Sequence, residues 1–136
     1  MEVERKEKKL PSGAVLRFNL AKFEDGRDLY QAFAEETKAV RFNSTRETGE
    51  VWKDLAVIAL SSKTIEAAIW KCFKRATYDT GTGEMKITTE TFEPPEARED
   101  YIPALLEIGK ENLQPFMKSL YAEFGPLIGL PPSAPA

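Results

Sequence analysis

The chain has 136 residues, of which 42% are hydrophobic and 30% are charged, a length and composition typical of one globular domain. Nineteen Lys and Arg against 22 Asp and Glu give a formal net charge of −3, which argues against the broad positive field that binds nucleic acid. The chain has no histidine, which excludes His-based acid–base catalysis, Ser-His-Asp and Cys-His nucleophiles, and most zinc and non-haem iron sites.

The number of cysteines and the distribution of apolar residues indicate the cellular compartment in which the protein is expected. The single cysteine, Cys72, cannot form an internal disulfide, and no N-terminal apolar run resembles a signal peptide or a membrane-spanning segment. We therefore expect a soluble protein of a reducing compartment, with neither a membrane nor nucleic acid among its partners.

A β-hairpin is predicted over about residues 3–20. Leu10-Pro11-Ser12-Gly13 has the composition of a turn, because proline presets φ and glycine tolerates the positive φ that closes many turns. The residues after it alternate between apolar and polar, with Leu16, Phe18 and Leu20 on one face. Because an isolated hairpin is marginal in water, we expect helices to cover this face.

Helical patterns follow the hairpin. Residues 24–41 carry apolar side chains at three- and four-residue steps, which is typical of an amphipathic helix. Residues 51–60 are apolar almost all round and predict a central helix that is buried on most sides. Ser61-Ser62 offers a cap at which the chain can stop and restart, and a second apolar stripe then runs from Ile65 to Ala76.

A turn and a short strand are predicted next. The residues from Asp79 to Gly83 form a turn by composition, and a strand is expected around Met85 to Thr88. A long last helix then begins near Pro94-Pro95.

Two prolines lie inside this last helix. Each removes a hydrogen bond and clashes with the preceding turn, so we expect a break near residues 100–102 ahead of Pro103 and a kink near residues 111–115. Gly125-Pro126 is expected to end the helix. The predicted architecture is an α+β domain, mostly helical, in which the N-terminal β-hairpin packs on a bundle of about four helices, the last one kinked at proline. The domain covers residues 1–126, and residues 127–136 form a proline-rich C-terminal tail.

One string has the composition of a catalytic motif. Asp79-Thr80-Gly81 is the tripeptide of retroviral-type aspartic proteases, in which two carboxylates share one proton and activate water. That chemistry needs the aspartate on a loop between apolar strands, and here the string is expected to follow a helix. A helix-terminating turn is therefore the preferred interpretation, and a DTG-type protease is the remote alternative. The overlapping Gly81-Thr82-Gly83 is not interpreted as a phosphate loop, because we expect no strand before it.

The clusters of charged residues are explained by their positions on helices rather than by binding of a metal or a nucleic acid. The acids between Asp79 and Asp100 match no EF-hand and suit the start of a helix, where the dipole favours negative charge. A basic cluster is interpreted as a solvated helix face rather than as a nucleic-acid patch; it consists of Lys63, Lys71, Lys74 and Arg75. Cys72 is interpreted as a small buried hydrophobe. We therefore predict no catalytic residue, no metal and no cofactor.

Several short strings, in one order along residues 10–124, resemble the tail assembly chaperones of long-tailed phages and prophages of Gram-positive bacteria. The early strings are Leu10-Pro11-Ser12-Gly13 before a strand, and Ser61-Ser62 opening a helix with Glu66, Trp70-Lys71-Cys72 and then Tyr78. The later strings are Thr91-Phe92-Glu93, Ala97-Arg98-Glu99-Asp100-Tyr101, Lys110-Glu111-Asn112-Leu113 and Pro115-Phe116. None of them is catalytic, and their order carries the resemblance.

The resemblance implies a non-enzymatic assembly factor that is made in the host cytoplasm and is absent from the mature virion. It would bind the tape measure protein and keep it soluble until tail-tube subunits polymerise around it. The tail-tube protein is a second candidate partner, and homo-oligomerisation stays open. A structural or tail-completion component of the phage tail is the alternative.

Apolar residues toward the C-terminus suit such a partner. A helix with a Phe/Leu stripe and adjacent Met and Tyr side chains has a wider apolar face than one neighbour usually covers. Packing on the central helix explains Phe116, Leu120 and Phe124 equally well. An amphipathic helical client needs an apolar stripe with a polar rim, and Met and aromatic side chains suit adaptable recognition. The predicted partner-binding residues are Met117, Tyr121, Phe124, Leu127 and Ile128.

Overall fold

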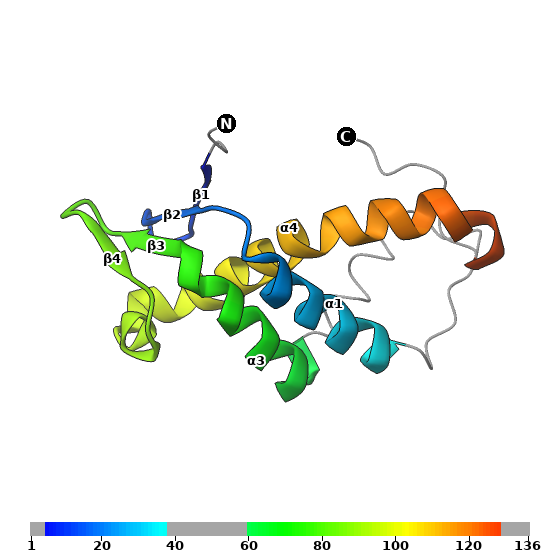
Figure 1. The fold of residues 1–136 in the computed structure, drawn as a ribbon. Coiled ribbons are helices and arrows are strands. Elements are labelled where there is room, and N and C mark those ends of the chain that lie inside the picture. The colour runs from blue at the N-terminus through cyan, green and yellow to red at the C-terminus, as the bar shows by residue number, and fades with distance from the viewer. Residues whose placement is uncertain (1–4, 38–59, 129–136) are drawn as a thin grey trace.

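The computed structural model describes residues 5–37 and 60–128, with the backbone alone for residue 37 and residues 120–128. In these ranges the chain is an α+β domain, in which a four-stranded antiparallel sheet packs against three α-helices (Figure 1). In chain order the elements are β1 (Lys6–Lys9), β2 (Val15–Phe18), α1 (Phe23–Thr37), α3 (Lys63–Cys72), the 3-10 turn η1 (Phe73–Arg75), β3 (Ala76–Asp79), β4 (Glu84–Lys86), the 3-10 turn η2 (Thr89–Phe92) and α4 (Pro95–Ile128).

The predicted N-terminal hairpin is formed by β1 and β2. Its turn is closed by two backbone hydrogen bonds, from the Leu10 amide to the Ala14 carbonyl at 2.8 Å and from the Gly13 amide to the Leu10 carbonyl at 2.9 Å. Gly13 has a φ of 95°, a left-handed conformation that glycine adopts without steric cost. The turn predicted from Leu10-Pro11-Ser12-Gly13 is therefore confirmed.

The sheet is larger than the predicted hairpin. The strand order is β1-β2-β3-β4, and β3 pairs antiparallel with β2, with Leu16 opposite Tyr78 and Phe18 opposite Ala76. The prediction that the helix runs as far as Ala76 is wrong, because α3 ends at Cys72 and η1 leads into β3. Ala76 and Tyr78 alternate with half-buried neighbours, and this period of two matches the inward face of β2.

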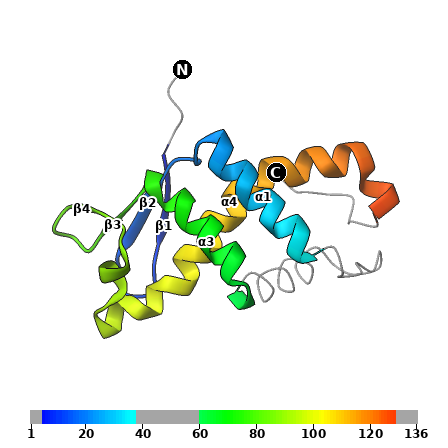
Figure 2. The same cartoon turned by 60° about the horizontal axis from the view of Figure 1, so that its bottom comes forward.

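The helices differ in number and arrangement from the predicted bundle of about four. The part of the chain that the structure describes holds three α-helices, and α3 and the first half of α4 lie against the sheet (Figure 2). The central helix predicted over residues 51–60 lies outside the described residues, apart from Leu60. The predicted cap before α3 is confirmed, since the Ser62 hydroxyl accepts a hydrogen bond of 3.1 Å from the Ile65 amide.

Helix α4 passes through both prolines. The break predicted near residues 100–102 is wrong, because the helix continues from Pro95 to Ile128, two residues beyond the predicted end at Gly125-Pro126. Its yellow first half and orange second half run in different directions in Figures 1 and 2, so the axis bends between them. Burial of Leu105 and Ile108 just beyond Pro103 supplies packing energy that offsets the hydrogen bond lost at proline.

The core lies between the sheet and the helices. Its largest fully buried apolar side chains come from β2, α1, α3 and α4 and are Leu16, Phe18, Leu29, Ile65, Ile69, Cys72, Leu105 and Ile108. Two polar residues are also buried, Asp100 and Asn112. In the described part of the chain, every buried side-chain nitrogen and oxygen atom has a hydrogen-bond partner.

Candidate functional site

Several side chains singled out in the sequence form hydrogen bonds between distant segments of the fold. Asp100 on α4 is fully buried, and its Oδ1 accepts a hydrogen bond of 2.9 Å from the Ser12 amide. Its Oδ2 accepts from the Ser12 hydroxyl at 2.5 Å and from the Tyr78 hydroxyl at 2.6 Å. Burial and the hydrogen bond to the carboxylate together raise the pKa of Tyr78. This Ser12–Tyr78–Asp100 network joins the hairpin turn, the sheet and α4.

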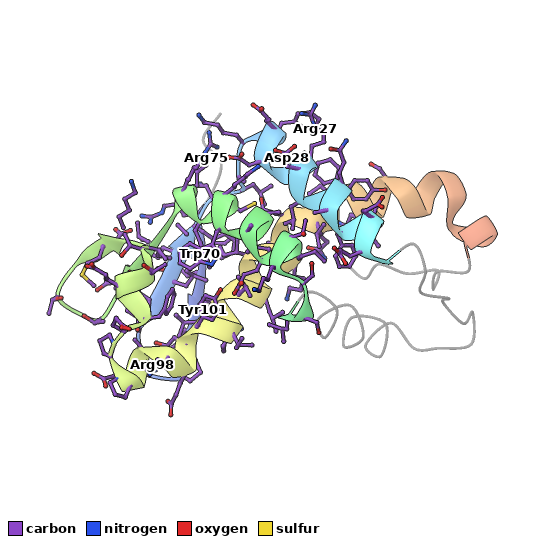
Figure 3. All side chains as sticks on the ribbon, turned by 90° about the horizontal axis from the view of Figure 1, so that it is seen from below. Arg27, Asp28, Trp70, Arg75, Arg98 and Tyr101 are labelled. Atoms are coloured by element: carbon purple, nitrogen blue, oxygen red, sulfur yellow. The ribbon has the colours of Figure 1, made fainter. Side chains whose placement is uncertain are left out.

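A second network joins α3 to α4. The Trp70 indole nitrogen donates to the Tyr101 hydroxyl at 3.0 Å, and that hydroxyl donates to the Glu66 carboxylate. The Trp70 and Tyr101 rings stack with their centroids 6.1 Å apart, and Figure 3 shows the two residues facing each other from their helices. Burial and the bond to Glu66 raise the pKa of Tyr101 to about 12. The hydroxyl therefore remains protonated at neutral pH.

A third motif residue fixes the connection between β2 and α1. The Asn112 Oδ1 atom accepts a hydrogen bond of 2.8 Å from the Ala21 amide, and its Nδ2 atom donates to the Ile108 carbonyl at 2.9 Å. In all three places the motif side chains are engaged in holding the fold.

The DTG string begins at the last residue of β3 and continues into the turn before β4, so the expectation that it follows and terminates a helix is wrong. The Asp79 Oδ1 atom accepts from the Gly81 amide at 2.8 Å and from the Gly83 amide at 3.2 Å, and both glycines have positive φ. Arg17 pairs with the other carboxylate oxygen at 2.8 Å. These contacts lower the pKa of Asp79. They also show that this carboxylate stabilises the turn of the β3–β4 hairpin.

The interpretation that no strand precedes Gly81-Thr82-Gly83 is also wrong, because β3 ends at Asp79. The turn leads into β4 rather than into a helix, however, so the helix N-terminus of a phosphate loop is missing at this place. The described residues hold no group of three or more Cys, Asp or Glu side chains arranged for a metal ion. They also hold no helix long and apolar enough to cross a membrane.

An aromatic cluster lies where α1 crosses α4. We define it as Phe23, Tyr30 and Phe116. The rings of Tyr30 and Phe116 stack with centroids 5.3 Å apart, and the rings of Phe23 and Phe116 are 6.1 Å apart. Phe23 is nevertheless 70% exposed, more than any other large hydrophobic residue whose side chain the structure describes, and the Arg27 guanidinium lies 5.8 Å from its ring centre. Aromatic residues and arginine are enriched at protein interfaces, so Phe23 and Arg27 offer contact area to a partner.

The predicted partner-binding residues all lie on α4, directly after this cluster. Met117 is half-buried and packs against the core, so part of its side chain stabilises the domain itself. The backbone at positions 121, 124, 127 and 128 continues the same helix. Steps of four, three and four residues place positions 117, 121, 124 and 128 on one side of α4, with position 127 beside them.

We call residues 117–128 the C-terminal arm. In Figures 1 and 2 the orange and red end of α4 extends past α1, on the side away from the sheet. The cluster borders the start of this arm, because Phe116 is its last residue before position 117. Phe23 was missed from the sequence, although Phe23, Arg27, Tyr30 and Ala34 recur at helical spacing on one side of α1.

Comparison with known proteins adds no family assignment: no family model, curated protein or solved structure matches this chain significantly.

Proposed function

We propose that this chain is a tail assembly chaperone that binds the tape measure protein and keeps it soluble during phage tail assembly, without enzymatic activity. It acts in the host cytoplasm and leaves before the virion is complete. The observation that carries this proposal is that α4 continues unbroken to Ile128, which presents positions 117, 121, 124 and 128 on one side of a helix. The aromatic cluster, of which Phe23 is exposed, ends at Phe116, directly before these positions.

The arrangement suits a helical client. A tape measure protein has long amphipathic helices, and a helix binds another protein by laying its apolar face on a complementary apolar surface. Aromatic and methionine side chains provide large contact areas that adapt to different partners. The polar networks around Asp100 and Tyr101 fix the first half of α4 against the sheet and α3, so the second half extends from a rigid base.

The test is co-expression with the tape measure protein encoded in the same genome. An affinity tag on this chain is expected to capture the tape measure protein and to raise its soluble fraction. The double variant Tyr121→Ser and Phe124→Ser is expected to lose both effects while its circular dichroism spectrum keeps the helical signal. A matched variant at exposed positions of the same helix, Lys118→Ser with Ser119→Ala, is expected to behave as the native chain.

Two outcomes would refute the proposal. Co-expression without capture and without a gain in client solubility would remove its basis. Detection of the chain in purified virions by mass spectrometry, at a level stoichiometric with tail proteins, would favour the structural or tail-completion component instead.

A further inference from the structure

A basic hollow of about 530 Å³ lies where β2 leaves the sheet toward α1 and where η1 enters β3. It is lined by three apolar residues (Leu20, Ala21 and Ala76), three cationic residues (Arg5, Lys74 and Arg75) and the polar residues Asn19 and Thr77. No acidic side chain of the described residues lines it. Figure 3 shows Arg75 beyond the end of α3, where the chain turns into the sheet.

The positive charge of this hollow is only partly neutralised. Arg5 is ion-paired with Glu84 and also donates a hydrogen bond of 3.2 Å to the Thr77 hydroxyl. Arg75 donates to the Leu20 carbonyl at 3.3 Å, which orients the guanidinium without neutralising it. Lys74 is exposed, and its ammonium group has no carboxylate partner among the described residues. Two cationic groups are thus left for a ligand, on a chain whose formal net charge is −3.

We propose that this hollow binds an acidic segment of a partner protein. Carboxylates of the segment pair with Lys74 and Arg75, and a small apolar side chain between them lies on the floor formed by Leu20 and Ala21. An isolated phosphate would leave this apolar floor unused. A nucleic acid would need a wider positive surface than three cations on an acidic chain provide.

The hollow lies at the sheet end of α1, and none of the residues that line it belongs to the C-terminal arm. The inference is independent of the proposed function, because none of the side chains that line the hollow belongs to α4 or to the aromatic cluster. A chain that fails to retain a tape measure protein can still bind an acidic peptide here, so the two proposals fail separately.

The experiment titrates the full chain into a fluorescently labelled peptide of alternating glutamate and leucine and follows the anisotropy. The control peptide replaces every glutamate with glutamine. Lys74→Gln is compared with Lys63→Gln, which makes the same charge change at an exposed position of α3 outside the hollow. Lys74→Glu gives a second, larger change at the same site.

The acidic peptide is expected to bind, and added salt is expected to weaken its binding. Lys74→Gln should weaken it about threefold, which is within the range of one partly exposed ion pair, while Lys63→Gln leaves it unchanged. Lys74→Glu should weaken it about tenfold, because it also places a negative charge beside the carboxylates of the peptide. Equal binding of the glutamine peptide, or equal loss in the two Gln variants, would overturn the proposal. Inorganic phosphate that displaces the peptide at equal concentration would show a phosphate site and would overturn the assignment to an acidic segment.

Discussion

The Tyr78 hydroxyl donates a hydrogen bond of 2.6 Å to the Asp100 carboxylate and so connects β3 to α4 inside the core. The same carboxylate accepts both the amide and the hydroxyl of Ser12, so that one side chain holds the turn, the sheet and the longest helix together. A buried carboxylate is tolerated here because three donors replace the water that it loses on folding.

Asp100→Ala is therefore expected to destabilise the domain by about 1–3 kcal/mol, since it leaves the buried Tyr78 hydroxyl without its carboxylate acceptor and removes both hydrogen bonds to the exposed Ser12. Urea unfolding followed by circular dichroism measures the change. Glu99→Ala alters the exposed neighbour on the same helix and should shift the free energy of unfolding by no more than about 0.5 kcal/mol. Equal effects of the two substitutions would show that the network does not stabilise the fold.

Gly109 lies inside α4, where alanine would ordinarily stabilise a helix by up to about 1 kcal/mol. A methyl group at this position would come within 3.0 Å of the Ile69 Cδ1 atom, whose side chain is buried. Gly109→Ala is expected to destabilise the native chain and to stabilise a chain that carries Ile69→Val, which lacks that carbon. A double-mutant cycle of unfolding free energies checks this change of sign. The same effect in both backgrounds would contradict close packing of α3 on α4.

The local elements of this fold could be predicted from the sequence. The Leu10–Gly13 turn, the helix after residue 22 and the Ser62 cap each depend on side chains within a few positions of one another. Strand β4 was likewise expected near its observed place, at Glu84–Lys86, because a composition rich in β-branched residues follows a glycine turn.

The remainder depends on contacts between distant segments. The run of residues 76–79 is too short for its sequence pattern to distinguish a strand from a helix. It forms β3 because β2 offers an edge for pairing, and buried residues alternate along both strands in the same way. Helix α4 survives Pro103 because of core packing that no local pattern reveals. The contact residues on α4 could be named from the apolar surplus, whereas the part played by Phe23 depends on how α1 crosses α4.

Cys72 is expected to react slowly with thiol reagents. It is 1% exposed, and burial raises the pKa of its thiol to about 12, so the reactive thiolate is roughly a thousandfold scarcer than for a thiol of ordinary pKa. Labelling with an aromatic disulfide should be slow for the native chain and fast in urea. Rapid labelling of the folded chain would show that α3 opens readily.

The stability of the domain should fall at alkaline pH. The folded pKa of Tyr101 lies near 12, above the value of 10.0 for an unperturbed tyrosine, so the folded state keeps its proton where the unfolded state has lost it. The stabilising contribution is complete below about pH 10 and is lost as the pH rises through about 12. Unfolding midpoints across this window measure the fall. Tyr101→Phe should reduce the slope, leaving a smaller one from Tyr78, whose pKa is also raised; an unchanged slope would contradict this assignment.

Phe23→Ser tests whether the binding surface extends from the C-terminal arm onto α1. The side chain is 70% exposed, so its removal should cost at most about 1 kcal/mol, mainly through the contacts with Phe116 and Arg27. Capture of the tape measure protein should fall severalfold, because an exposed aromatic ring at the base of the arm contributes most of its area to a partner. Glu24→Ser, at the adjacent exposed position, provides the control and should leave capture unchanged. If Phe23→Ser retains the client as well as the control does, while the Tyr121 and Phe124 variant loses it, the client contacts α4 alone and the aromatic cluster serves only to join the two helices.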